Sequence, residues 1–318
     1  MKLGLVFPGQ GSQAVGMMSA YVEHPVVHET FVEASQVLGQ DLWALVQDGP
    51  AEVLNQTVNT QPVMLAADVA VYRAWLAAGG AEPWVMAGHS LGEYAALVAA
   101  GAIAFADALP LVRFRAQAMQ DAVPQGVGAM AAIMGLDDEG VVAACADAAQ
   151  TQSVEAVNFN APGQVVIAGH KEAVERAIVA AKARGAKRGL LLPVSAPFHS
   201  KLLRPAAEKL AAYLAGVTVR DAHPAVLHNV DVARAATPDA IRTALARQAA
   251  SPVRWVGTIQ AFVEQGVTHI AECGPGTVLT GLARRIATGV EILPLNDADA
   301  IAAAITATAS QEARDARR

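Results

Sequence analysis

The sequence predicts an α/β fold with a mostly parallel sheet and a smaller inserted unit. Strand-like and helix-like stretches alternate from the N-terminus, as they do in parallel sheets connected by helices. The rhythm changes between about residues 126 and 194, where the order is β-α-β-β-α-β, the ferredoxin-like unit. Of the 318 residues, 53% are hydrophobic and 16% are charged, so a large core is available to both parts.

The first part of the chain supplies the beginning of the parallel sheet. Its expected elements are a strand at residues 3–7, a helical region to about residue 38, a helix at 63–78, a strand and a helix on either side of Ser90, and a helix at 109–123. Gln61-Pro62 is expected to open the helix at 63–78. Asp107 is expected to be the N-cap of the helix at 109–123.

The remainder of the chain contains the insertion and the rest of the parallel sheet. In the insertion we expect strands at 127–133, 154–159, 164–168 and 189–194, and helices at 137–149 and 171–184. After it we expect a helix from Lys201, strands at 225–230, 268–273 and 291–295, and helices at 238–249, 252–264 and 278–286. The predicted units are a large catalytic subdomain (1–125 and 195–308), a small subdomain (126–194) and a polar tail (309–318).

Composition argues against several classes of protein. No apolar run reaches the roughly 20 residues of a membrane span, and the first residues form no signal peptide, so we expect a cytoplasmic protein without a membrane partner. Only Cys145 and Cys273 occur, far apart, so we expect no metal site and no disulfide framework. A net charge of −6 does not favour nucleic acid as a partner. We also expect no cofactor and a monomeric chain.

One basic stretch departs from the acidic balance of the chain. Residues 182–188 contain Lys182, Arg184, Lys187 and Arg188 and no acid. These residues suit a solvated helix end, because cations are favourable near the C-terminal end of the helix dipole. They also suit a docking patch for an acidic partner. Composition alone favours the helix end and leaves the docking patch open.

The most informative motif is Gly88-His89-Ser90-Leu91-Gly92, between an apolar stretch and a helix-like stretch. A serine flanked in this way by two glycines, between strand and helix, is typical of a nucleophile elbow. The turn is so tight that a Cβ at either glycine would clash. The following helix presents N–H groups and its positive dipole end to an anion, where the oxyanion of acyl transfer forms. We therefore interpret Ser90 as an acyl-transfer nucleophile.

A serine nucleophile needs a neighbouring base, and His199 is the best candidate among eight histidines. It follows a buried strand, and functional groups of open α/β sheets collect beyond the carboxyl ends of strands. His89 precedes Ser90 on the same strand, so its side chain is expected to point to the opposite face of the sheet and to be structural.

No acid stands in an obvious place to complete a Ser-His-Asp set. Asp221, Asp231 and Asp239 are available, but nothing in their context selects one. A backbone carbonyl can also orient an imidazole through its Nδ1–H.

Arg115 is expected to lie inside the apolar arc of its helix, whereas Arg113 falls on the polar side. A buried arginine is unfavourable without an anionic partner, which is either an internal carboxylate or the carboxylate of a substrate. The second possibility suits a serine enzyme that handles an acid-bearing acyl group.

The turn Gly9-Gln10-Gly11 follows the first strand. The next glycine, Gly16, comes too late for a dinucleotide-binding motif. We prefer a tight turn that brings the backbone N–H of Gln10 to the oxyanion.

Together these motifs resemble the malonyl-CoA:acyl carrier protein transacylases of bacterial type II fatty acid synthesis, over nearly the whole chain. The matching segments are 7–13, 61–62, 88–94, Arg115, 158–164, 198–200, 229–231 and 272–276. The resemblance implies an α/β-hydrolase-like large subdomain with a ferredoxin-like insertion, in agreement with the order of elements. It also implies malonyl transfer from malonyl-CoA to the thiol of holo acyl carrier protein.

The resemblance implies a role for each matching position. Ser90 becomes malonylated, His199 takes its proton, Leu91 and Gln10 form the oxyanion hole with their N–H groups, Arg115 pairs with the malonyl carboxylate, Phe198 disfavours an α-methyl branch, and the carbonyl of Gln248 orients the histidine. Because carrier proteins are acidic, the resemblance favours docking at Lys187 and Arg188, with Arg284 and Arg285 as second candidates.

Other functions remain to be distinguished. The same chemistry serves other pathways, such as the malonyl transferase of a malonate decarboxylase or a discrete polyketide acyltransferase. A serine esterase or thioesterase would use water as the acceptor, but a buried Arg115 argues against it. A binding module without catalysis is disfavoured by the intact set of Ser90, His199 and Arg115.

Overall fold

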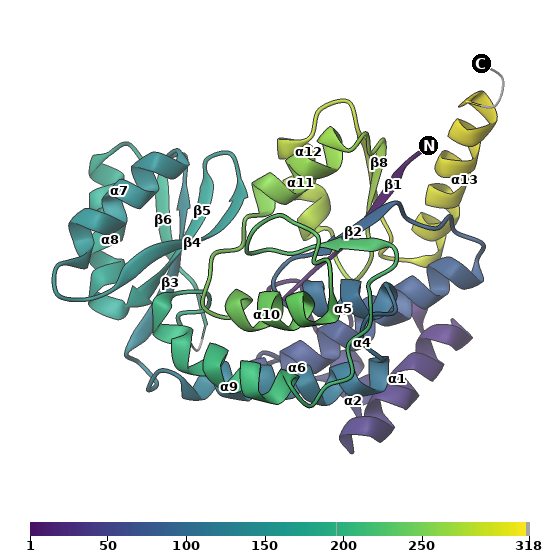
Figure 1. Cartoon of the computed structure of the whole chain (residues 1–318), viewed down its shortest axis with the longest axis horizontal. Coiled ribbons are helices and arrows are strands. Elements are labelled where there is room, and N and C mark those ends of the chain that lie inside the picture. The colour runs from purple at the N-terminus through teal and green to yellow at the C-terminus, as the bar shows by residue number, and fades with distance from the viewer. Residues whose placement is uncertain (195, 316–318) are drawn as a thin grey trace.

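The computed structural model describes residues 1–194 and 196–315 and contains two separate sheets (Figure 1). The larger sheet has the order β7-β2-β1-β8-β9, and all its pairings are parallel. Its strands are β1 (Leu3–Phe7), β2 (Val85–Gly88), β7 (Ala225–Leu227), β8 (His269–Glu272) and β9 (Glu291–Pro294). The predicted α/β fold with a parallel sheet is confirmed.

Helices cover both faces of the parallel sheet. They are α1 (Pro25–Leu38), α2 (Leu42–Asp48), α3 (Ala51–Leu54), α4 (Thr57–Ala77), α5 (Gly92–Ala99), α6 (Phe105–Asp121), α9 (Arg204–Leu214), α10 (Pro238–Gln248), α11 (Trp255–Glu264), α12 (Val278–Ile286) and α13 (Ala298–Asp315), with 3-10 turns η1 (Ser19–Tyr21) and η2 (Lys201–Leu203). Leu5 and Phe7 of β1 belong to the core built with α1, α4, α5 and α6. Val6 belongs to the core built with α11 and α12. This alternation is that of a strand buried on both faces.

The smaller sheet is antiparallel and has the order β4-β5-β3-β6. Its elements are β3 (Gly128–Met134), α7 (Asp138–Ala149), β4 (Val154–Ala161), β5 (Gln164–His170), α8 (Lys171–Ala183) and β6 (Arg188–Leu191), which confirms the predicted β-α-β-β-α-β order. The sheet has its own core with α7 and α8. It is joined to the larger part at Val253, whose amide N–H donates to the carbonyl of Val157 and whose carbonyl accepts from Phe159.

Two expected helix starts are wrong. Helix α4 begins at Thr57, so Pro62 lies inside it and does not open it. The helix is buried around most of its circumference, and this tertiary packing overrides the local signal of the proline. Helix α6 begins at Phe105 with Ala104 as its N-cap, and Asp107 lies in the first turn. At that position the carboxylate still suits the positive end of the helix dipole.

The long helical region expected before residue 38 is broken. Only α1 is a regular helix there, because residues 8–18 form turns and loops. The C-terminal helix α13 continues to Asp315, into the region predicted as a polar tail, and residues 316–318 of that tail lie outside the described residues. Across residues 1–194 and 196–315, no helix combines the length and apolar character needed to cross a membrane.

Candidate active site

The nucleophile elbow follows β2, at the carboxyl end of the parallel sheet. Ser90 has a φ of 52°, in the left-handed region that non-glycine residues rarely adopt. A Cβ on Gly88 would lie 1.9 Å from the carbonyl carbon of Gly92, and a Cβ on Gly92 would lie 2.0 Å from the carbonyl oxygen of Phe7. Only glycine fits at either place, so the backbone can turn sharply and present the serine hydroxyl to the pocket.

His199 lies beside the serine hydroxyl. Its Nε2 is 2.7 Å from Ser90 Oγ, and its Nδ1 is 2.9 Å from the carbonyl oxygen of Gln248. Because a carbonyl can only accept, Nδ1 carries the proton and Nε2 is left with a lone pair toward the serine. Burial, together with the nearby positive charge of Arg115, lowers the pKa of His199 to about 3. The imidazole is therefore neutral and able to accept the serine proton at neutral pH.

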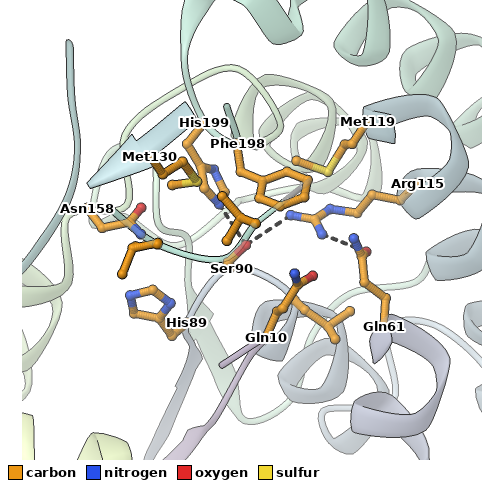
Figure 2. A pocket seen from close by; sticks show the side chains of 13 residues that line it. Gln10, Gln61, His89, Ser90, Arg115, Met119, Met130, Asn158, Phe198 and His199 are labelled. Carbon is orange, nitrogen blue, oxygen red and sulfur yellow. Dashed lines mark hydrogen bonds between the residues drawn. The ribbon is translucent and has the colours of Figure 1, made fainter. Parts of the chain in front are cut away.

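Arg115 enters the pocket from α6 and is 2% exposed, as the apolar arc of its helix predicted. Its NH1 donates to Gln61 Oε1 at 2.7 Å, and its NH2 donates to Gln248 Oε1 at 2.9 Å and to Ser90 Oγ at 3.1 Å. Among the described residues, no carboxylate lies within ion-pair distance of this guanidinium, and its Nε has no acceptor. The charge is thus held by neutral groups beside the nucleophile (Figure 2).

Gln248 contacts Ser90, His199 and Arg115. Its carbonyl accepts from His199, its Oε1 accepts from Arg115, and its Nε2 donates to the carbonyl of Ser90 at 2.9 Å. The side chain is fully buried. We call Ser90, His199, Arg115, Gln61 and Gln248 the pocket cluster.

Gln10 and Leu91 line the pocket from neighbouring turns. Within the described part of the chain, neither backbone N–H donates a hydrogen bond. The turn after β1 approaches the elbow closely, since a Cβ on Gly9 would lie 2.3 Å from the carbonyl oxygen of His89 and 3.5 Å from Leu91 N. The side chain of Gln10 is fixed by Thr57, whose hydroxyl donates to it at 2.8 Å.

Many of the side chains that line the pocket are apolar. Figure 2 shows the lining side chains, of which Met119, Met130, Leu192, Val194 and Phe198 are apolar. They come from α6, from β3 and from the segment after β6. The pocket beside the elbow is therefore lined by residues from both parts of the molecule.

Only the expected direction of the His89 side chain is wrong, because its contacts with Asn160 and Trp255 fit the structural role predicted for it. Its side chain lines the same pocket as Ser90, and its Nε2 lies 2.8 Å from Oδ1 of Asn160 on β4. The strict alternation of strand side chains does not extend to this residue, because β2 ends at Gly88. Burial lowers the pKa of His89, so the ring is a neutral hydrogen-bonding partner between the elbow and the smaller sheet.

The three candidate acids lie away from the histidine. Asp231 pairs with Arg247 at 3.5 Å and Asp239 with Arg242 at 2.7 Å. In the described structure, neither these nor Asp221 bonds to His199, whose Nδ1 is bound by a carbonyl.

The basic candidates fall into two groups. Lys187 and Arg188 are exposed at the start of β6. Arg284 and Arg285 are exposed in the last turn of α12, where Arg284 donates to the carbonyl of Ile292 and Arg285 to the carbonyl of Pro162.

Some buried polar side chains near the site were given no role from the sequence, among them Gln61, Glu93 and Asn229. For Glu93 a signal existed, because it is an acid in an otherwise apolar helix, the same argument that selected Arg115. For Gln61 and Asn229 the contacts join segments far apart in the chain, and no spacing could have indicated them.

Comparison with known proteins agrees with this geometry. Residues 5–308 match the acyl transferase domain family. The chain is 56% identical to the malonyl CoA-acyl carrier protein transacylase of Escherichia coli K12, over 96% of this chain and 99% of the relative. It superimposes on the acyl-carrier-protein S-malonyltransferase of Burkholderia pseudomallei 1710b with a TM-score of 0.95 and 61% identity, over 96% of this chain and 100% of the other. A type II PKS malonyl-transacylase, solved in complex with its acyl-carrier protein, is similar at 53% identity and a TM-score of 0.95, over 96% and 99% of the two chains.

Proposed function

This chain belongs to the acyl transferase family as a malonyl CoA-acyl carrier protein transacylase, and from this premise we propose that the malonyl group passes through a covalent intermediate on Ser90. The observation that carries the proposal is the 2.7 Å contact of Ser90 Oγ with a neutral His199, beside an arginine that has no carboxylate partner in the described structure. The transfer supplies malonyl groups to fatty acid synthesis.

In the first half-reaction, Ser90 Oγ attacks the thioester carbonyl of malonyl-CoA while His199 Nε2 takes its proton. The N–H groups of Leu91 and Gln10 are the donors available for the oxyanion, since neither is bonded within the described residues. Collapse of the tetrahedral intermediate breaks the C–S bond, and the imidazolium returns the proton to the leaving thiolate of coenzyme A.

In the second half-reaction, the same steps run in reverse with another thiol. The phosphopantetheine thiol of holo acyl carrier protein gives its proton to His199 and attacks malonyl-Ser90. The C–O bond breaks and Ser90 recovers its proton. Coenzyme A leaves before the carrier protein binds, so the kinetics are ping-pong.

Arg115 selects the acyl group. In the free enzyme its guanidinium is bonded to the amides of Gln61 and Gln248, and none of the described acids neutralises it. A malonyl carboxylate next to Ser90 supplies the missing negative charge and accepts charge-assisted, bidentate hydrogen bonds from the guanidinium. An acetyl group leaves the buried cation unpaired. Phe198 lines the pocket beside these groups and disfavours an α-methyl branch.

The carrier protein docks on exposed basic residues of the smaller sheet. Support comes from the exposure of Lys187, which precedes β6, and of Arg188, its first residue, since β6 leads into the pocket-lining segment with Leu192 and Val194. Charge reversal at Lys187 and Arg188 should raise the KM for carrier protein and leave malonyl-Ser90 formation unchanged.

The cytoplasmic location and the monomeric state remain predictions from the sequence.

Intact-protein mass spectrometry tests the proposed route. Mixing the enzyme with malonyl-CoA alone should add one malonyl group, which holo carrier protein should remove and the apo form, lacking the thiol, should not. Ser90→Ala should show no adduct. Free malonate as the main product with holo carrier protein present would indicate a hydrolase. A holo carrier protein of polyketide synthesis as the preferred acceptor would assign the chain to that pathway, which the similar polyketide transacylase makes a relevant comparison.

A further inference from the structure

Asn229 lies directly behind the nucleophile and takes no part in the chemistry above. It follows β7 and is fully buried. Its Oδ1 accepts the backbone N–H of Ser90 at 2.7 Å, and its Nδ2 donates to the carbonyl of Gly88 at 2.7 Å. One side chain thus bonds both Gly88, before the turn, and Ser90, at its apex, and so holds the strained backbone between them.

Glu93 holds this side chain in place from the first turn of α5. Its Oε2 accepts the backbone N–H of Asn229 at 2.8 Å, and its Oε1 lies 2.8 Å from Nδ1 of His228. Glu93 is 0% exposed and His228 is 2% exposed. We call Glu93, His228 and Asn229 the elbow clamp.

We propose that Asn229 is a positioning residue for catalysis, and that Glu93 acts through it. The inference rests on the proposed role of Ser90 as the nucleophile. A serine at φ 52° is in a sparsely populated conformation, which persists only when surrounding contacts impose it. Asn229 imposes it on the amide side of Ser90, and Gln248 Nε2 holds the carbonyl side.

The clamp also determines which amides are available to the substrate. The Ser90 N–H is consumed by Asn229, whereas the next N–H along the chain, that of Leu91, has no acceptor among the described residues. If the Ser90 amide were released, the turn could rotate. Both Ser90 Oγ and Leu91 N would then move away from the positions they need for attack and for the oxyanion. Displacements of about 1 Å at a catalytic group reduce rates by on the order of 100-fold.

The decisive experiment compares Asn229→Ala with Tyr21→Phe. The control removes one buried hydrogen bond, from the Tyr21 hydroxyl to the carbonyl of Leu295, outside the pocket. For Asn229→Ala we expect kcat for malonyl transfer to fall by about 100-fold and KM for malonyl-CoA to change by less than about threefold. The rate at which phenylmethylsulfonyl fluoride sulfonylates Ser90 should fall in parallel. Tyr21→Phe should keep both rates near those of the wild type.

Glu93 variants separate hydrogen bonding from charge. Glu93→Gln keeps an acceptor for the Asn229 N–H. Without the carboxylate that favours its charged form, the ring of His228 is neutral and accepts a hydrogen bond from the new amide, so kcat should stay within about fivefold of the wild type. Glu93→Ala removes both contacts and should behave like Asn229→Ala. Equal losses for Gln and Ala would overturn the part assigned to Glu93.

Wild-type kcat and wild-type sulfonylation in Asn229→Ala would overturn the proposal. If that variant does not fold, Asn229→Leu replaces it, because it keeps most of the side-chain volume and loses both hydrogen bonds, and the same two rates decide. Sulfonylation requires no malonyl group. A wild-type enzyme that reacts with the sulfonyl fluoride but forms no malonyl-Ser90 would therefore refute the proposed function and leave the clamp testable.

Discussion

The pocket cluster and the elbow clamp meet at Ser90 and differ in how their buried charges are partnered. In the pocket cluster, Arg115 is held by the amides of Gln61 and Gln248, without an acid among the described residues. In the elbow clamp, Glu93 is bonded to His228. The charged groups of both clusters are buried, so solvent does not account for the difference. A buried charge without a counter-charge is available to a substrate, whereas a paired one serves to hold the backbone.

The two histidines show the same contrast. Burial and the charge of Arg115 lower the pKa of His199 to about 3. Burial also opposes the charged form of His228, but the Glu93 carboxylate outweighs it and raises the pKa of that ring. One imidazole is kept neutral to accept a proton, and the other is favoured as a cation that anchors an acid.

Removal of the base should have the largest effect on the pocket side. His199→Ala leaves Ser90 without a proton acceptor, so kcat for malonyl transfer should fall by about 10³-fold or more, as a general base contributes about 10² to 10⁴. Steady-state transfer to holo carrier protein measures the loss, and circular dichroism checks the fold. A loss below tenfold would show that another group accepts the proton.

Removal of the unpaired cation should change the substrate preference. In Arg115→Ala, kcat/KM for malonyl-CoA should fall by about 100-fold, and acetyl transfer should rise because no buried charge then demands a carboxylate. The matched control is Arg113→Ala on the same helix, whose guanidinium bonds Gln40 and lies outside the pocket. Retention of malonyl preference in Arg115→Ala would mean that specificity resides elsewhere.

Giving Arg115 an internal acid should make the pocket cluster resemble the elbow clamp. Gln61→Glu places a carboxylate where an amide oxygen accepts from Arg115 at 2.7 Å. The substrate carboxylate must then compete with it, so KM for malonyl-CoA should rise by about tenfold. Gln61→Met removes the hydrogen bond without adding charge and should have a smaller effect. Equal KM values for the two variants would disprove competition by charge.

The smallest effect concerns stability against pH. The pKa of His228 is raised in the folded state. Its contribution to the free energy of unfolding is therefore fully present below pH 6.5 and is lost as the pH rises through the pKa of the folded protein. The Tm advantage of the wild type over His228→Gln should therefore shrink between pH 6 and pH 9. His199 has the opposite sign, since its pKa is lowered, so His199→Gln should gain Tm relative to the wild type as pH falls below 6.5. If the Tm difference from the wild type varied with pH in the same way for both variants, the opposite pKa shifts of His228 and His199 would be contradicted.

Much of this site could be predicted from local patterns. The elbow at Ser90 is defined by glycines two residues away, and the burial of Arg115 follows from the periodicity of one helix. His199 was selected by its place after a buried strand of the parallel sheet, and that reason was wrong, because β6 is largely exposed and belongs to the antiparallel sheet. The residue itself does lie beside Ser90. The signals for Ser90 and Arg115 lie within a few residues of the side chain they predict.

The neutral partners of Arg115 and the clamp behind Ser90 could not be predicted in this way. Gln61 lies 54 residues from Arg115, and Asn229 lies 139 residues from Ser90. Such contacts depend on how sheets and helices pack, which also moved the start of α4 ahead of Pro62 and turned His89 into the pocket. Tertiary packing decided these features, and it leaves no pattern in a short stretch of sequence.

The long separations between Ser90 and its supports have a consequence for the order of synthesis. A chain made from its N-terminus contains the nucleophile well before Asn229, and the histidine 49 residues before the carbonyl of Gln248 that orients it. The growing polypeptide therefore carries an unsupported serine until both later residues have left the ribosome. A protein truncated before residue 248 should retain the whole elbow motif and still be inactive.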